Sequence, residues 1–543
     1  MGDANYITHL LLLVAAYLTW HYFWRFRSLN NIPGPASKSF LKGNLPEFFG
    51  RYGTEFQKEV ALDYGPVVKM RGLLSRPILY ISDPKALHHL LIKEETVFEE
   101  SQRFLSTNQV MFGPGLLSTL GEHHRKQRKM LNPVFSVAHM REMLPIFYNV
   151  VHRVRDAIAT RVENGQQDID VLNWMGRTAL ELIGQGGLGY SFDPLTEDMK
   201  DSYGHALKQL LPNLTTIEII RRLLPLVAGL GPAWFRRRVA EMFPWKPVQR
   251  VRRVVDTMHE RSMAIYKEKQ VALRNGDEAV AKQIGSGKDI MSILMRANMN
   301  ALQADRLPEE EVIAQMSILS FAATDTTSNT VSRILQLLAE HPDIQEKLRI
   351  ELISSGAGNG LPYDALNKLP LLDAVCRESL RLYPPVVTVA RVPNRDSVLP
   401  LLEPIRGIDG KIMTEVHVPK GTEVIIGVLG SNANKARWGE DALEWKPERW
   451  LSPLPKAVTD APIPGVYSNL MSFLGGKRAC IGFKFSEMEM KVVLAVLVSS
   501  FTFELTDDPI EWNVAGVRYP TIGRESDVPE LPLKVSLYKP AII

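Results

Sequence analysis

Phe473-Leu-Gly-Gly-Lys-Arg-Ala-Cys-Ile-Gly482 carries the strongest signal in this chain, and an apolar helical run from Phe483 to Leu497 follows it. The segment contains Cys480, one of only two cysteines; the other is Cys376. Backbone N–H groups and the positive end of a helix dipole favour a thiolate at such a position. The glycines let a flat ligand approach the backbone closely, and Arg478 can pair with an anionic group. An inert buried thiol remains the alternative for any cysteine taken alone.

The whole segment resembles the haem-binding loop of the cytochrome P450 family, in which the cysteine is the axial thiolate of the haem iron. The resemblance implies that Cys480 is the axial ligand of haem b, and that Phe473 and Arg478 are further haem-binding residues. Five residues carry the match: Phe473, Gly476, Arg478, Cys480 and Gly482.

The resemblance extends over Pro33–Pro532 and implies the P450 fold, a single large domain that is mainly α-helical, with small β-sheets, around a buried haem. The residue pattern agrees with this. Two β-type runs, 67–70 and 77–81, predict a hairpin. Leu307–Glu340 predicts one helix about 50 Å long that crosses the domain. Further helices are expected at 140–162, 171–183 and 251–273, and a mobile surface loop at 275–288.

The middle of the long helix holds seven consecutive polar residues, Thr324–Thr330. Such residues weaken a buried helix unless something uses them, and they cover every face of the helix. Ala322-Ala-Thr-Asp-Thr-Thr327 resembles the oxygen-activation motif of the family, with Ala323 where glycine is commoner. The resemblance implies two catalytic residues: Thr326 orders the dioxygen site, and Asp325 feeds a proton relay.

Three further basic residues are expected to hold the haem propionates. Gly121–Arg128 resembles the family's C-helix, on which His124 and Arg128 share a face because they are four residues apart. His124 stands where tryptophan is commoner. Arg391, which follows Tyr383-Pro-Pro385, takes the place of the third donor. Each of these residues, taken alone, would more often be a surface charge.

A structural ion-pair network is expected beside the haem. Glu378 and Arg381 lie three residues apart on a helix with apolar neighbours. If the pair is buried, leaving one partner alone would be strongly destabilising. Pro447-Glu-Arg-Trp450 resembles the family's second arginine segment. We therefore expect Arg449 to complete a network with Glu378 and Arg381 that is structural and not catalytic.

The N-terminal segment Ile7–Trp24 is almost wholly apolar. As a helix it would be roughly 27 Å long, about the hydrocarbon thickness of the endoplasmic reticulum membrane. Arg25 and Arg27 follow it and no basic residue precedes it, so the positive-inside rule places the rest of the chain in the cytosol. Bulky aromatic residues stand where a cleaved signal peptide needs small ones. We expect a single-pass anchor, residues 1–30, before a catalytic domain, residues 31–543.

Charge and composition exclude other classes of function. The 64 Lys and Arg residues against 60 Asp and Glu residues give a net charge of +4, too small to imply nucleic-acid binding. Two cysteines build neither a disulfide framework nor a Cys-rich zinc site. Gly184–Gly189 satisfies the GxGxxG pattern but follows a helical run, so it predicts a helix end and not a dinucleotide site. The electrons must then come from another protein, and the resemblance implies NADPH-cytochrome P450 reductase.

Mostly apolar segments are expected to line the substrate pocket, which indicates a lipophilic small molecule. They are 112–117, Phe321, 386–390 and 520–522. Leu223–Phe235, flanked by arginines, is predicted to be an interfacial loop that dips into the membrane, with a buried core segment as the alternative. Gly121–Ser136 and Gly187–Asp193 resemble fungal members of the family, in which terpenoid and other secondary metabolism is common.

These patterns together predict a haem-thiolate monooxygenase that inserts one atom of dioxygen into its substrate. Two alternatives remain open: a P450-fold isomerase or dehydratase that acts on a peroxide without a reductase, and a haem-binding sensor or carrier without turnover. Asp325 and Thr326 argue against the isomerase, because the rearrangement of a peroxide needs no proton relay.

Overall fold

The computed structural model describes residues 24–195, 202–227, 229–303 and 305–539, together with His9 and Leu13. Most of the expected anchor, Ile7–Trp24, lies outside these residues. Among the described residues, no helix combines the length and the apolarity that a membrane crossing requires.

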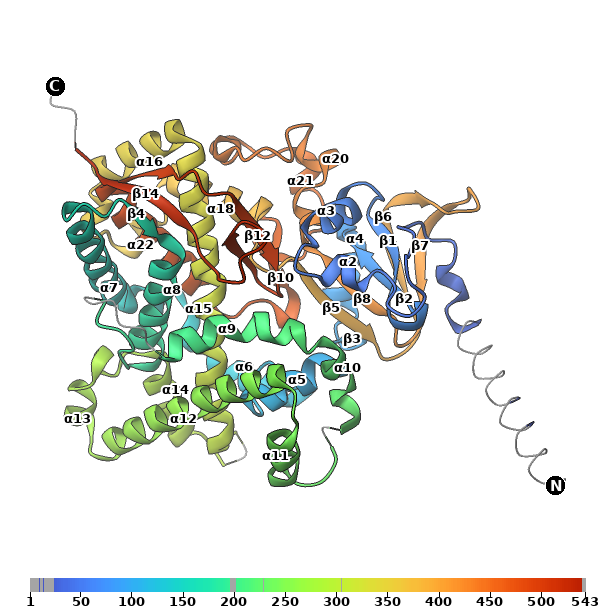
Figure 1. Ribbon diagram of the computed structural model, residues 1–543, viewed down its shortest axis with the longest axis horizontal. Helices are drawn as coiled ribbons and strands as arrows, with labels where there is room; N and C mark the ends of the chain where they lie inside the picture. Colours follow the sequence, from blue (N-terminus) through green and yellow to red (C-terminus); the bar gives the residue numbers. More distant parts are fainter. Residues whose placement is uncertain are drawn as a thin grey trace.

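The helices form one large body, and the strands of the N-terminal part gather at its side (Figure 1). The longest helix runs through the middle of the helical body and packs against helices from both halves of the chain. The helices of eight or more residues are α3 (Thr54–Leu62), α5 (Gln102–Phe112), α6 (Gly121–Leu131), α7 (Val137–Glu163), α8 (Val171–Leu182), α9 (Ser202–Thr216), α10 (Glu218–Val227), α11 (Ala233–Met242), α12 (Lys246–Arg274), α14 (Ile290–Asn300), α15 (Glu309–Glu340), α16 (Pro342–Ser354), α18 (Pro370–Leu382) and α22 (Phe483–Ser500). The shorter helices are α2 (Leu45–Phe49), α4 (Pro84–His88), α13 (Asp277–Ala281), α17 (Tyr363–Leu366), α19 (Val428–Asn432), α20 (Lys435–Trp438) and α21 (Lys456–Thr459).

The largest sheet has five strands in the order β1-β2-β8-β5-β3. Its first two strands form the hairpin that the sequence predicts, with Val67 opposite Ile81. A separate apolar cluster lies beneath this sheet and includes Phe26, Leu29 and Ile32, so the packed part of the chain already begins at Phe26. The strands are β1 (Val67–Arg71), β2 (Pro77–Ile81), β3 (Phe98–Glu99), β4 (Asp168–Asp170), β5 (Thr388–Pro393), β6 (Ser397–Arg406), β7 (Ile412–Val418), β8 (Glu423–Gly427), β9 (Gly465–Tyr467), β10 (Leu470–Gly475), β11 (Phe501–Leu505), β12 (Ile510–Val514), β13 (Arg518–Ile522) and β14 (Pro532–Leu537).

The long central helix α15 keeps its regular course through the polar run that the sequence singles out. Three threonine hydroxyls donate to the carbonyl four residues earlier: Thr324 to Ser320 at 2.7 Å, Thr326 to Ala322 at 2.8 Å, and Thr330 to Thr326 at 2.8 Å. Side chains that bond the preceding turn do not need water or a distant partner. The helix therefore satisfies much of its own polar run.

The glycine-rich run ends a helix, as the sequence predicts. Helix α8 continues through a wider turn, Ile183–Leu188, and stops at Gly189, whose backbone is left-handed with φ of 60°. The expected loop 275–288 is only partly a loop, because it contains α13 and a further turn, Ile284–Gly287. The acidic residues at the start of α13 favour this short helix.

The carboxylate of Glu378 is fully buried and is the centre of the expected network. Both of its oxygens accept bonds from Arg381 at 2.8 Å, and Arg449 donates to it at 3.0 Å. The Trp450 indole and the Lys446 backbone N–H complete the shell at 2.9 and 3.1 Å. The structure confirms that these residues lie together.

This network is linked to the strand that leads to Cys480. Arg381 donates to the Asn432 carbonyl at 3.3 Å. The Asn432 side chain in turn accepts a bond from the Met471 backbone at 2.8 Å and donates to Ser472 at 2.9 Å. Because Met471 and Ser472 belong to β10, the buried ion pair helps to set the position of β10.

Replacing Glu378 by Ala should lower the stability of the folded protein by about 3–5 kcal/mol, because Arg381 would be left buried without its carboxylate and Arg449 would keep only Asp441. The midpoint of thermal unfolding measures this loss. The matched control is Arg141→Ala, which removes an exposed ion pair with Asp364 and should leave the midpoint nearly unchanged. Equal midpoints for the two variants would contradict the structural role of the network.

Candidate active site

The cysteine loop joins β10 to α22 through a tight turn. The Cys480 backbone N–H donates to the Phe473 carbonyl at 2.9 Å, which closes the loop. Gly476 has a φ of 73°, and a Cβ atom there would lie 2.2 Å from the Leu91 carbonyl oxygen. Only glycine fits this position, because both the left-handed backbone and the close approach exclude a side chain. The glycines of the loop thus serve to present Cys480.

The thiol of Cys480 has accessible surface although protein surrounds the residue. Burial raises the pKa of this thiol above its ordinary value, while the Gly482 N–H and the charge of Arg128 act in the opposite direction. The helix start therefore favours the thiolate as the sequence predicts, but burial outweighs it. An accessible sulfur atom inside the protein is suited to bind a ligand that enters the space beside it.

Helix α6 brings His124 and Arg128 to the cysteine loop. Nη1 of Arg128 donates to the Ala479 carbonyl at 2.8 Å. His124 lies on the same face and is only 6% exposed. Burial and the nearby guanidinium charges lower the pKa of His124 to about 3. His124 is therefore neutral at pH 7 and offers a ring nitrogen but no charge, unlike the basic group that the sequence suggests.

Arg391 from β5 and Arg478 from the cysteine loop meet at one carboxylate. Arg391 pairs with Glu100 at 3.2 Å, and Arg478 pairs with the other oxygen of Glu100 at 3.3 Å. Burial lowers the pKa of Arg391, Arg478 and Arg128 alike, which means that all three charges are poorly solvated. Arg391 and Arg478 share this one carboxylate and Arg128 has none, so the three guanidinium groups leave a surplus of two positive charges near Cys480.

These residues fit a haem. The surplus of positive charge matches the two propionate groups of the porphyrin, and the accessible thiol of Cys480 is the ligand type that the haem iron takes in a haem-thiolate protein. Phe473 packs against the Tyr467 ring at 5.4 Å and the Phe483 ring at 6.1 Å, and so braces the loop from which the sulfur extends. The fit to haem therefore rests on the thiol and on the guanidinium groups that lie near it.

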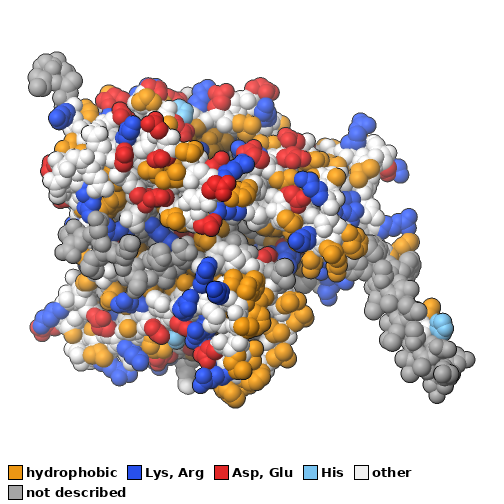
Figure 2. Space-filling view, viewed as in Figure 1, with side chains coloured by type: hydrophobic (Ala, Val, Ile, Leu, Met, Phe, Trp, Pro, Cys, Tyr) orange, Lys and Arg blue, Asp and Glu red, His pale blue; other side chains and the backbone are white. Residues whose placement is uncertain are grey.

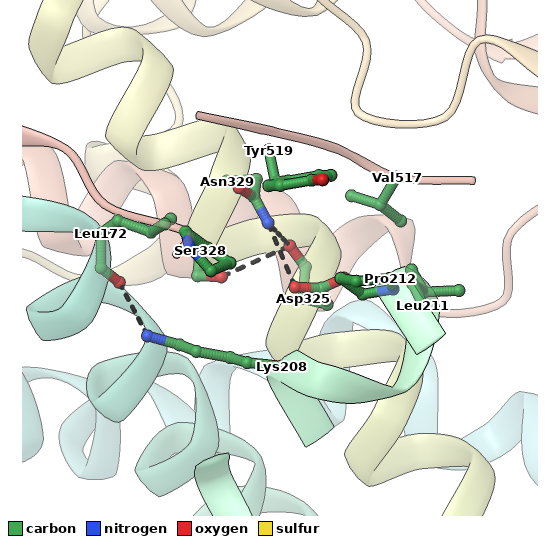
Figure 3. Close-up of a pocket in the computed structure, with 10 residues that line it drawn as sticks. Leu172, Lys208, Leu211, Pro212, Asp325, Ser328, Asn329, Val517 and Tyr519 are labelled. Carbon is green, nitrogen blue, oxygen red and sulfur yellow. Dashed lines mark hydrogen bonds between the residues drawn. The ribbon is translucent and has the colours of Figure 1, made fainter. Parts of the chain in front are cut away.

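Asp325 lies in a small enclosed pocket between α15 and α9 (Figure 3). Its carboxylate accepts a bond from Asn329 at 3.2 Å. Lys208 reaches the same pocket from α9 and donates to the Leu172 carbonyl at 3.3 Å. Burial raises the pKa of Asp325 to about 6, although the charge of Lys208 and the Asn329 bond lower it. The free space is about 10 Å³, on the order of what one water molecule needs.

Thr326 follows Asp325 on α15 and faces a different direction, one hundred degrees further round the helix. Its hydroxyl donates to the carbonyl of Ala322, and Ala322 is exposed although it lies in the middle of the central helix. The next residue, Thr327, bonds the hydroxyl of Ser486 on α22 at 3.1 Å. This contact joins α15 to the helix that follows Cys480.

Two of the expected pocket-lining segments, 112–117 and Phe321, lie together. The rings of Phe112 and Phe321 are 5.1 Å apart, and the Leu116 N–H donates to Gln315 on α15 at 3.2 Å. In the segment 520–522, Thr521 is fully buried inside the β12–β13 hairpin. The turn of that hairpin brings Val517 to the Asp325 pocket.

Glu100 and Lys208 are site residues that sequence reasoning missed. Glu100 holds two of the haem-side arginines, and Lys208 acts electrostatically on Asp325. Neither belongs to a recognisable motif, and both are paired with residues that lie more than a hundred positions away. Only their burial and their partners identify them.

The comparisons with known proteins agree with this site. The family model described as Cytochrome P450 matches residues 33–516. The chain is 62% identical over 517 residues to "Cytochrome P450 monooxygenase 81" of Postia placenta, covering 95% of this chain and 94% of that protein. It is 49% identical over 530 residues to "Ganoderic acid synthetase CYP5150L8" of Ganoderma lucidum, covering 96% and 97%. The resemblance to fungal proteins, drawn from two short stretches, is confirmed.

Replacing Cys480 by Ser should abolish the spectrum that a thiolate-ligated haem shows with carbon monoxide, because a neutral hydroxyl cannot act as the thiolate ligand. The matched control is Cys376→Ala. Cys376 is fully buried in α18, where burial raises its pKa to about 12, so its loss should leave the spectrum in place. A normal spectrum in the Cys480 variant would contradict the ligand assignment.

Proposed function

Because the chain belongs to the cytochrome P450 family and is a haem b-dependent monooxygenase, we propose that it inserts one atom of dioxygen into a lipophilic small molecule. We further propose that its electrons come from NADPH through NADPH-cytochrome P450 reductase. The observation that supports this most is the accessible Cys480 thiol near the buried Arg391 and the half-buried Arg128 and Arg478, together with Asp325 and Thr326 on the central helix α15.

In the proposed reaction the haem supplies the activation of dioxygen, and the protein supplies binding and protons. Cys480 would hold the iron, Arg128, Arg391 and Arg478 would bind the propionates, and His124 would contribute a ring N–H. The Thr326 hydroxyl donates its hydrogen to the Ala322 carbonyl, so its oxygen would be free to accept a hydrogen bond at the distal side. This arrangement would deliver protons to the dioxygen from the side of Thr326. The reaction requires such control, because protons delivered to the wrong oxygen atom release hydrogen peroxide instead of product.

Asp325 is suited to move protons toward that place. Its pKa of about 6 lies near neutral pH, so the carboxyl group can both take up and release a proton there. Lys208 limits how far burial raises this pKa, and the pocket between them has room for about one water molecule. We propose a path for protons from the α9 side through Asp325 to Thr326.

The substrate is proposed to be lipophilic because aromatic side chains meet on α15 one turn before Asp325. Phe112 and Phe321 pack against each other there, and the turn after α5 lies against α15. One relative is named for the synthesis of ganoderic acid. This name supports a product of secondary metabolism, and a terpenoid substrate is the proposal that follows from the family resemblance.

Membrane association is proposed from the surface as well as from the N-terminal segment. A group of exposed apolar side chains, here called the apolar patch, covers the region of α10 and α11 (Figure 2). Its members are Leu223, Leu226, Val227, Leu230, Trp234, Phe235, Val239, Met242, Phe243 and Trp245. Apolar patches of this extent mark interaction or membrane surfaces. Two proposals follow: residues 1–30 anchor the chain in the endoplasmic reticulum, and residues 31–543 form a cytosolic catalytic domain.

The predicted interfacial loop at Leu223–Phe235 is largely helical, because it falls on the end of α10 and the start of α11. The arginines that precede it, Arg221 and Arg222, are paired within the protein and do not form a free basic flank. Arg221 and Arg222 pair with Glu218, and Arg103 pairs with the same carboxylate. The attraction of the apolar patch to a membrane therefore depends on its apolar side chains more than on these charges.

The proposed function is tested by co-expressing the full chain with the reductase in a fungal or yeast host and profiling the metabolites under ¹⁸O₂. A monooxygenase gives a product that carries one ¹⁸O atom, and its formation requires NADPH. A product that forms without NADPH and without the label would support the isomerase alternative. Haem-loaded protein that neither consumes NADPH nor changes any metabolite would support the sensor or carrier.

Thr326→Ala should uncouple the reaction without stopping it, because haem binding and reduction do not depend on this hydroxyl. NADPH is still consumed, but the product formed per NADPH falls several-fold and hydrogen peroxide rises. The control is Thr324→Ala, whose buried hydroxyl bonds only the Ser320 carbonyl and which should keep its coupling. Unchanged coupling in the Thr326 variant would mean that the motif is structural.

Lys208→Met should move the titration of Asp325 to higher pH. The charge of Lys208 lowers the pKa of Asp325, so its removal lets burial raise that pKa further above 6. The measurement is the pH dependence of product formed per NADPH. In the Asp325→Asn variant this pH dependence should be absent, which would assign the titration to Asp325. If the midpoint of the pH dependence is unchanged in the Lys208 variant, Lys208 does not influence the proton path.

Deleting residues 1–23 should weaken membrane binding without removing it, because the apolar patch remains; the cut preserves Phe26, which is buried. Adding Leu226→Asp and Trp234→Asp to the deletion should reduce binding to lipid vesicles by more than tenfold, since two large apolar side chains are lost from the lipid contact. Ile350→Asp on α16, an equally exposed position, is the control. Release by the deletion alone would contradict a role for the patch.

A further inference from the structure

A second pocket lies on the other side of the Asp325 motif, further along α15. It has a volume of about 330 Å³, within the range of small-molecule sites. Asn329, Thr330 and Arg333 of α15 form one wall. The β12–β13 hairpin, helix α3 and the turn after α18 form the others. None of the residues expected to hold the haem lines this pocket.

Two arginines line the inner part of the pocket without a carboxylate partner. Arg518 is only 8% exposed, and its Nε has no hydrogen-bond partner; the Nε of Arg333 also has none. Arg518 donates only to Gln57, at 3.4 Å, and Arg333 donates to Gln336 at 2.9 Å. Among the described residues, no carboxylate lies within ion-pair distance of either guanidinium group.

The acidic residues of the pocket lie at its outer part. Glu55 pairs with Lys58 at 2.9 Å, and Glu511 lies 3.5 Å from Arg524. Glu340 is exposed at the end of α15. The outer part of the pocket therefore carries three carboxylates against two cations, while its inner part carries two positive charges, so that the pocket as a whole has a surplus of one positive charge.

The two inner arginines also destabilise each other. Burial lowers the pKa of Arg518 to about 10, and repulsion by Arg333 is the next cause, while the charge of Glu55 acts in the opposite direction. A buried charge beside a half-buried like charge, with no carboxylate within ion-pair distance, is costly to a folded protein. Such a pair is compensated when an anion binds between or beside the two groups.

The walls favour an organic anion over a simple ion. The guanidinium group of Arg333 lies 4.3 Å from the ring of Tyr383 and 5.2 Å from the ring of Trp512, so a flat apolar surface adjoins the charge. A guanidinium group matches a carboxylate by two parallel hydrogen bonds. We propose that this pocket binds the carboxylate group of an amphipathic organic acid, with Arg333 and Arg518 as its anion-binding residues.

This site adjoins the Asp325 pocket, with which it shares Asn329, but its two arginines take no part in the proposed proton path. Asn329 and Thr330 lie one turn of α15 beyond Asp325 and Thr326, and Pro385 directly precedes a segment expected to line the substrate pocket. An acid bound here contacts the same helix as the proton path without replacing any residue of it. The proposal depends on the two arginines and holds whatever the substrate of the haem site.

The test uses the haem-loaded full chain in detergent and isothermal titration calorimetry, with 1-naphthoate as the probe and 1-naphthamide as its uncharged counterpart. Naphthoate should bind at least tenfold more tightly than the amide, because only the acid supplies the missing charge. It should also raise the melting temperature more than the amide does. Equal affinity for the two compounds would overturn the proposal, as would inorganic phosphate that binds as tightly as naphthoate.

Variants assign the binding to this pocket. Arg333→Gln and Arg518→Gln should each weaken naphthoate binding by about tenfold or more. Arg524→Gln is the matched control, because this arginine lies at the exposed outer part near Glu511 and should change the affinity by less than threefold. Unchanged affinity in both inner variants would overturn the proposal.

The inner variants also report on the folded state. Either one removes a group from a repelling pair, so the ligand-free melting temperature should stay the same or rise. If Arg518→Gln fails to fold, Arg518→Lys retains the charge but loses the two-pronged hydrogen bonding and should still weaken naphthoate binding several-fold. Full affinity in Arg518→Lys together with full affinity in Arg333→Gln would overturn the assignment.

Discussion

The buried carboxylate of Glu378 is the constraint on which the site depends. A charge with no access to water must be matched by charges and hydrogen bonds in a fixed geometry, and here Arg381, Arg449 and their neighbours supply them. The same Arg381 reaches Asn432, and Asn432 holds β10, from which the Cys480 loop extends. The position of the sulfur is therefore tied to an ion pair that takes no part in the chemistry.

Four places in the molecule hold buried charge, and they differ in how that charge is balanced. Around Glu378 the charges are balanced within the protein. Beside Cys480 they are not, and the excess of positive charge is suited to an anionic cofactor, which haem b provides through its propionates. Near Arg518 the excess again lacks a partner in the chain. Asp325 is a fourth and milder case, in which burial shifts a carboxyl group toward neutral pH and a nearby lysine limits the shift.

Much of the fold and part of the site could be predicted from the sequence. The hairpin at β1–β2, the course of α15, the helix end at Gly189 and the grouping of Glu378 with Arg381 all depend on local periodicity, on glycine and proline positions, or on a long motif, and all are confirmed. The interfacial loop and the surface loop at 275–288 were predicted less well, because short helices such as α13 give too weak a periodic signal to be separated from a loop.

The residues of the site could be identified from the chain alone, because a cysteine in a glycine-rich loop before a helix and an Asp–Thr pair within a long helix are patterns of neighbouring residues. The electrostatics of the site, in contrast, come from the folded arrangement. It made His124 neutral, gave Glu100 to two arginines, set Lys208 beside Asp325, and left Arg518 unpaired. These properties arise from burial and from partners far away in the chain, and neither can be read from the residues next to them.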